Sequence, residues 1–120
     1  MLYRFHGALA TLVLAIVPAW SWATCAREAD GSDACASELI RLLDVTQAGD
    51  IYVMPTSSLA PASTGFSCAP VLGQYLVLNS TASNFKSLYA ALLSARIVGA
   101  PVTLVMDRMQ AACTIAYALL

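Results

Sequence analysis

The stretch from residue 84 to 107 joins an apolar helix pattern to an alternating apolar run, and it constrains the fold more than any other segment. Apolar side chains recur at steps of three and four residues and form one stripe: Phe85, Leu88, Tyr89, Leu92 and then Ala95 or Arg96. Gly99 lies where a helix can end in the left-handed conformation, and Pro101 prevents the helix from resuming. The pattern predicts one helix, capped by Ser83, that leads into a strand over residues 102–107.

Four further segments have the pattern of β-strands. Residues 39–45 and 51–55 flank the turn sequence Gln-Ala-Gly-Asp and predict a hairpin, although a helix over 37–45 competes with the first strand. Residues 73–79 and 113–120 predict the third and the last strand. The resulting order is three strands, one helix and two strands. This mainly β (α+β) order is typical of the OB-fold, a five-stranded antiparallel barrel with one helix between its third and fourth strands.

The first 23 residues have the features of a secretory signal peptide. A basic start precedes an uncharged run over residues 7–22, and the small residues Ser21 and Ala23 occupy the positions that a signal peptidase requires. Cleavage after Ala23 leaves residues 24–120 as a single OB-like domain that is secreted or periplasmic and has no membrane segment. An uncleaved membrane anchor is the competing interpretation, and the uncharged run is short for a spanning helix.

All four cysteines lie in residues 24–120, at positions Cys25, Cys35, Cys68 and Cys113. An even number of cysteines in a small exported domain predicts two disulfides, and three pairings are possible. We favour Cys25 with Cys35 and Cys68 with Cys113. The first pair brackets a polar segment, residues 24–37, that we expect to be a loop, and the second pair lies at strand edges. Residues 56–70, rich in Ser, Thr, Pro and Gly, are a second predicted loop.

Charge and composition argue against several functions. Residues 24–120 carry five cationic and seven acidic side chains, and five minus seven gives a net charge of −2 without a basic patch. Electrostatic binding of nucleic acid is therefore not expected. The same residues contain no histidine, which removes Ser-His-Asp and Cys-His arrangements, and no C-x-x-C metal motif. We expect a non-catalytic protein without a metal or a cofactor.

Several predicted strands are apolar on both faces. In the last strand, Ala116 and Ala118 face away from Tyr117 and Leu119, and no member of this set is charged. An antiparallel strand in a lone small domain usually alternates apolar with polar residues. We therefore expect the helix or a second copy of the chain to cover the excess apolar surface. We predict a homo-oligomer that uses a strand edge or face.

The helix-to-strand segment resembles a known protein family. Phe85, Leu88 and Tyr89 form F-x-x-L-Y, and after nine residues Gly99, Pro101 and Val102 form G-x-P-V. This looks like the corresponding segment in the receptor-binding B subunit of subtilase cytotoxin and its pertussis-like relatives, and in many small exported bacterial proteins.

The resemblance implies an OB-fold, bacterial secretion, disulfides, pentameric rings and binding of sialylated glycans. In the toxin subunit a serine at the start of the first strand contacts the sugar, and Ser37 is the nearest match. Met106 occupies the position of a tyrosine that contributes to that sugar site. We expect an exported binding module with a glycan or a protein partner. The alternative is a periplasmic structural or inhibitory partner protein without sugar binding.

Overall fold

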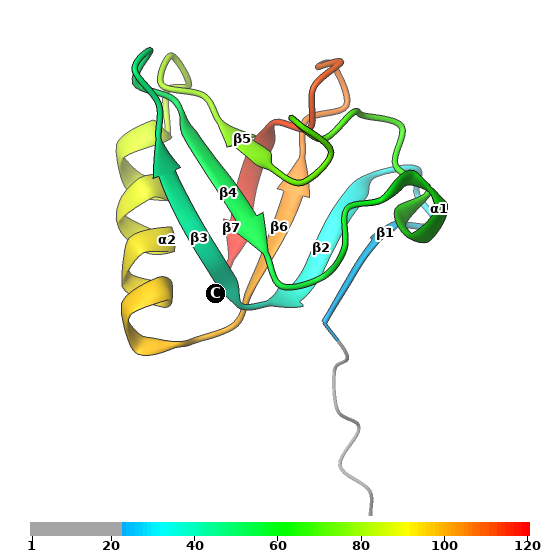
Figure 1. Ribbon diagram of the computed structural model, residues 1–120, viewed down its shortest axis with the longest axis horizontal. Coiled ribbons are helices and arrows are strands. Elements are labelled where there is room, and N and C mark those ends of the chain that lie inside the picture. The colour runs from blue at the N-terminus through cyan, green and yellow to red at the C-terminus, as the bar shows by residue number, and fades with distance from the viewer. Residues whose placement is uncertain (1–22) are drawn as a thin grey trace, which may run out of the picture.

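A computed structural model describes residues 23–120, and these form two antiparallel β-sheets with two helices (Figure 1). The four-stranded sheet has the order β1-β2-β6-β7, from β1 (Thr24–Arg27), β2 (Asp33–Glu38), β6 (Val102–Met106) and β7 (Ile115–Leu119). The three-stranded sheet has the order β3-β4-β5, from β3 (Ile40–Val45), β4 (Ile51–Pro55) and β5 (Leu76–Leu78). The mainly β prediction is confirmed. The described residues form two sheets and not one closed barrel. The predicted signal peptide lies outside the described residues, except for Ala23.

The two sheets are joined at two places. Only Leu39 separates β2 from β3, so one nearly continuous stretch of chain contributes a strand to each sheet. At the other place, Val77 of β5 forms a parallel bridge with Thr114, and the Val77 N–H donates to the carbonyl of Cys113 at 2.8 Å. The sheets therefore share one core.

The N-terminal part of the fold differs from the sequence prediction. Residues 24–37 were expected to form a loop, but most of them form the hairpin of β1 and β2, in which Cys25 lies directly opposite Cys35. The prediction failed because the alternating positions are occupied by alanine and cysteine, which are weak strand signals, around a polar turn. The predicted strand over 73–79 is shorter, because Leu72 and Gly73 have positive φ angles and form a tight turn. The predicted loop over 56–70 contains the single helical turn α1 (Pro61–Thr64).

The long helix α2 (Phe85–Val98) lies between β5 and β6, where the sequence placed it. Its buried residues are Leu88, Leu92 and Ala95, all on the predicted stripe. Gly99 has a φ of 69°, and its N–H donates to the carbonyl of Ala95, as expected for a helix end. The predicted cap was wrong: Asn84 is the N-cap residue, and its side chain makes no capping hydrogen bond.

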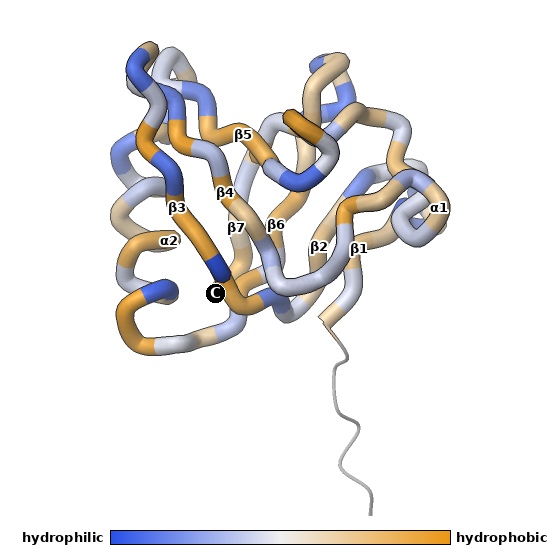
Figure 2. The backbone as a smooth tube through the Cα atoms, viewed as in Figure 1, coloured by the Kyte–Doolittle hydropathy of each residue, from blue (hydrophilic) through white to orange (hydrophobic). Residues whose placement is uncertain are grey.

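The core lies between the two sheets and α2. Its fully buried side chains include Val53, Leu76, Leu78, Leu92 and Leu104. Figure 2 shows hydrophobic residues along the strands, whereas the turn between β3 and β4 is mostly hydrophilic. Two disulfides border this core, Cys25–Cys35 and Cys68–Cys113, and this is the pairing that the sequence favoured. No helix in residues 23–120 is long and apolar enough to cross a membrane.

Candidate functional site

Ser37, the residue predicted to contact a sugar, lies at an irregularity between β2 and β6. Its φ of 52° falls in the left-handed region, and its N–H donates to Oγ1 of Thr103 at 3.1 Å. Met106 lies at the other end of β6, is buried and pairs with Ile115. The two positions implied by the family resemblance are therefore not brought together. A role for Ser37 in ligand binding stays a prediction.

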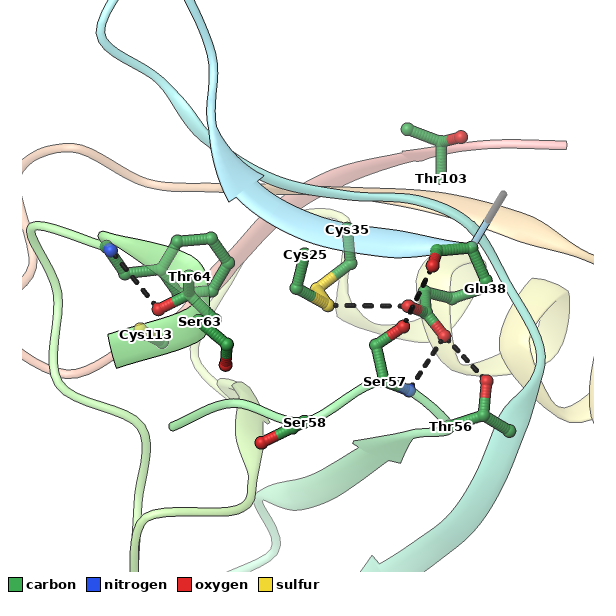
Figure 3. The surroundings of a disulfide bond; sticks show 12 residues. Cys25, Cys35, Glu38, Thr56, Ser57, Ser58, Ser63, Thr64, Thr103 and Cys113 are labelled. Carbon is green, nitrogen blue, oxygen red and sulfur yellow. Dashed lines mark hydrogen bonds between the residues drawn. A yellow bond between two sulfur atoms is a disulfide. The ribbon is translucent and has the colours of Figure 1, made fainter. Parts of the chain in front are cut away.

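The neighbour of Ser37, Glu38, is fully buried at the corner between β2 and β3 (Figure 3). Its Oε2 accepts hydrogen bonds from Oγ1 of Thr56 at 2.8 Å and from the N–H of Ser57 at 3.2 Å. Its Oε1 lies 3.5 Å from Sγ of Cys25. A disulfide sulfur carries no proton to donate, so this last contact is one of packing. Glu38 thus ties the corner between the sheets to the chain that leaves β4, which is a structural role.

A second buried carboxylate, Asp33, ties the loop before β5 to β2. Its Oδ2 accepts from the N–H and the hydroxyl of Ser67 at 3.0 and 2.7 Å, and from the N–H of Cys68 at 3.2 Å. Its Oδ1 is buried and has no hydrogen-bond partner among the described residues. Three donors on one oxygen explain how a carboxylate is tolerated in this position.

The arrangement best suited to bind a ligand is a cavity of about 440 Å³ that we call the polar pocket. It lies between the turn that precedes α2 and the connection from β6 to β7. Seven of its ten lining residues are polar: Asn79, Thr81, Ser83, Asn84, Asp107, Gln110 and Thr114. Its volume is in the range of small-molecule sites, which lie between about 300 and 1,000 Å³.

Three side chains of the polar pocket each use one polar atom for a hydrogen bond within the fold. Each has a second polar atom that makes no such bond. Oδ1 of Asn79 accepts from the N–H and the hydroxyl of Thr81 at 2.9 and 2.8 Å. Nδ2 of Asn84 donates to a backbone carbonyl of β7 at 3.0 Å. Oδ1 of Asp107 accepts from the backbone two residues further on at 2.9 Å. Within the described part of the chain, Nδ2 of Asn79, Oδ1 of Asn84 and Oδ2 of Asp107 make no hydrogen bond. One donor and two acceptors on residues that line the pocket are therefore without a partner in the described part of the chain.

Sequence reasoning missed this pocket. Residues 79–84 were interpreted as a turn and a helix cap, and Asp107 as the end of a strand at a surface turn. Both segments are turns in the structure, although the cap of α2 is Asn84 and not Ser83. The available signal was the polar composition of the two turns. Nothing local in the sequence shows that the two turns line the same pocket.

Among the described residues, the ionisable group with a clearly perturbed pKa lies outside the polar pocket. Hydrogen bonds from the hydroxyl and the N–H of Ser32 lower the pKa of Asp30 from its usual value of 3.8. Asp30 is exposed on the turn between β1 and β2, where Nη2 of Arg108 approaches its carboxylate at 3.6 Å. In residues 23–120, no three His, Cys, Asp or Glu side chains cluster in a way that could hold a metal ion.

The chain was compared with protein-family models, with curated proteins and with solved structures, and none of them matches it.

Proposed function

We propose that the protein is an exported, non-catalytic binding module that recognises a polyhydroxylated ligand, a glycan, in the polar pocket. The observation that carries the proposal is that Asn79, Asn84 and Asp107 each use one polar atom for the fold and leave another for a ligand. A sugar hydroxyl both donates and accepts a hydrogen bond. Amide and carboxylate groups side by side can supply the matching acceptor and donor.

The proposed architecture is an OB-like one, in which β2 and β3 act as a single bent first strand. The pairing of β2 with β6, of β3 with β4 and the parallel bridge between Val77 and Thr114 support it. In OB-folds, the loop between the fourth and fifth strands is a recurrent contact for oligosaccharides and oligonucleotides. Here the matching connection supplies Asp107 and Gln110 to the polar pocket. The net negative charge favours the sugar over the nucleic acid.

Export, self-association and a bacterial source belong to the same proposal. The predicted signal peptide and the two disulfides support an oxidising compartment outside the cytoplasm. The resemblance to toxin B subunits and the uncharged last strand support assembly of several copies. We include Ser37 as a second candidate for contact with the glycan, at a separate place on the surface.

A glycan array probed with the full chain, exported and recovered with its disulfides formed, tests this function. We expect binding that Asp107→Ala weakens by at least about tenfold, the effect of losing roughly 1.4 kcal/mol of hydrogen bonding. Asp44→Ala on the exposed surface of β3 is the matched control and should leave binding unchanged. Thermal unfolding of each variant shows whether the fold is intact.

The variants also separate the two candidate sites. Loss of binding in Ser37→Ala, with no effect of Asp107→Ala, would move the site from the polar pocket to the β2–β6 irregularity. An array on which the folded protein binds no glycan would refute the sugar-binding proposal and favour a role that depends on a protein partner.

A further inference from the structure

Strand β7 is the last strand of the four-stranded sheet, and most of its outer edge is open. On its inner edge β6 pairs with it, Thr103 opposite Leu119. On its outer edge, Asn84 donates to the carbonyl of Ala116. The Asp107 N–H donates to the carbonyl of Thr114, so Val105 and Thr103, which alternate with it along β6, also direct their N–H and C=O groups to β7. Tyr117 and Leu119 lie opposite these two residues, so Ala118 between them directs both of its groups outward. Within residues 23–120, no hydrogen bond reaches this edge beyond Ala116.

The open edge also lacks the usual protection against pairing with another chain. Edge strands in natural proteins commonly carry charged residues or proline. Two of the other three terminal strands follow this rule, since β1 contains Arg27 and β3 contains Arg41 and Asp44. The third, β5, has no charge or proline, but Val77 at its middle bridges Thr114. Strand β7 contains neither charge nor proline, and its one bulge lies before the open part. Its side chains Tyr117 and Leu119 are 51% and 58% exposed.

An apolar groove of about 440 Å³ lies at the C-terminal end of this edge, where Leu120 lines it together with α2, Ala100 and Pro101. The two ends of helix α2 lie near the two ends of this edge: Asn84, its N-cap, contacts Ala116, and Val98 at its end lines the groove together with Leu120. The helix wall of the groove is formed largely by small residues, including Ala90, Ala91 and Ser94. Small side chains leave room for the side chains of an additional strand between α2 and β7.

We propose that a second copy of the chain occupies this place and pairs its own β7 antiparallel to the first, about a two-fold axis near Ala118. Ala118 then lies opposite its copy, with both outward backbone groups hydrogen-bonded, and Tyr117 lies beside the partner's Leu119 as an aromatic–aliphatic cross-strand pair. Ala118 and Leu120 of each strand project on the side of the partner's apolar groove. This inference deepens the proposed function, because it names the surface through which copies of the chain associate. It rests only on the self-association in that proposal.

Charge and area both favour a second copy as the occupant. At a two-fold axis any charged group would approach its own copy, and residues 109–120 contain no charged side chain. A fully exposed large side chain has about 150–250 Å² of surface, so the exposed parts of Tyr117, Leu119, Leu120 and Val98 amount to roughly 500 Å² per copy. Two copies would bury up to about 1,000 Å², which reaches the lower limit for a specific interface.

Sedimentation velocity of the exported full chain over a micromolar concentration series tests the proposal, with Tyr117→Lys as the variant. Lysine at this exposed position places a charge beside an apolar partner residue without touching the core. We expect a dimer for the unaltered protein and a dissociation constant at least about tenfold higher for Tyr117→Lys. Val45→Lys, an equivalent change at an exposed position on β3, is the matched control and should still dimerise.

Hydrogen exchange gives a second, independent measurement. The amide of Ala118 should exchange more slowly as the protein concentration rises, because it becomes hydrogen-bonded only in the dimer. A monomer throughout the series, an assembly that Tyr117→Lys does not weaken, or an Ala118 amide insensitive to concentration would each overturn the proposal. The glycan array with Asp107→Ala probes a separate surface, so failure of the dimer and failure of sugar binding are distinguishable.

Discussion

The two disulfides should contribute unequally to stability, and the structure predicts which contributes more. Cys68–Cys113 joins residues 45 positions apart, from the loop before β5 to the connection between β6 and β7. Cys25–Cys35 joins residues only 10 apart, within a hairpin that backbone pairing already holds together. A disulfide stabilises the fold mainly by restricting the unfolded chain, and the restriction grows with the size of the loop it closes.

The chain-entropy relation converts these separations into free energies. For a loop of 45 residues it assigns about 4.0 kcal/mol at 25 °C, and for a loop of 10 residues about 2.7 kcal/mol. Replacing each pair with two alanines removes the cross-link and leaves a small cavity at each former cysteine. All four cysteines are at most 8% exposed, so the cavity terms of the two double variants are similar. The difference of about 1.3 kcal/mol therefore reports loop closure.

Urea unfolding of the two double variants, monitored by circular dichroism, measures this difference. We expect both variants to be less stable than the oxidised protein, with the midpoint of Cys68→Ala/Cys113→Ala lower than that of Cys25→Ala/Cys35→Ala by roughly 0.5–1 M. A smaller loss for the 45-residue link than for the 10-residue link would refute the reasoning. It would mean that native-state packing around the hairpin disulfide outweighs loop entropy.

Three further changes have defined outcomes. Asp33→Ala should lower the free energy of unfolding by about 2–4 kcal/mol, because two donors of Ser67 and the buried N–H of Cys68 lose their acceptor, whereas Asp33→Asn retains an acceptor and should cost less in urea unfolding. Leu72→Asn should raise the free energy of unfolding by about 0.5–1 kcal/mol, because Leu72 has a φ of 53° and is mostly exposed, and asparagine tolerates this conformation. An unchanged or lower urea midpoint would contradict the strain argument. Ser32→Ala should return the pKa of Asp30 toward 3.8 in an NMR titration. Because the pKa of Asp30 is lower in the folded state, its ionised form favours folding above the unfolded pKa, and this contribution is lost as the pH falls through the folded pKa. An unchanged titration in Ser32→Ala would assign the shift to another group.

Prediction from the sequence succeeded in segments where apolar residues repeat with one clear spacing. Helix α2 was recognised because its buried residues repeat at helical spacing and a glycine and a proline mark its end. Strands β4 and β6 were recognised because buried and half-buried residues alternate along them. The hairpin of β1 and β2 was missed because alanine and cysteine carry little strand signal, and its stability comes from a partner strand and a cross-link.

The polar pocket could not be predicted, for a different reason. Asn79, Asn84 and Asp107 belong to two turns separated by a helix and a strand. Their convergence depends on how α2 packs and on the register between β6 and β7, which includes a bulge. No spacing rule along the chain encodes that geometry.

The sequence by itself determined the mainly β class and the place of the long helix, because local periodicity records which residues are buried. It favoured one of three possible cysteine pairings, and this is the pairing in the structure. The tertiary structure alone decided that the chain forms two sheets, that two polar turns meet in a pocket, and that β7 keeps an open, uncharged edge beside an apolar groove. These features arise from contacts between segments distant in the chain, whose energies depend on register and packing and not on the residues of any single segment.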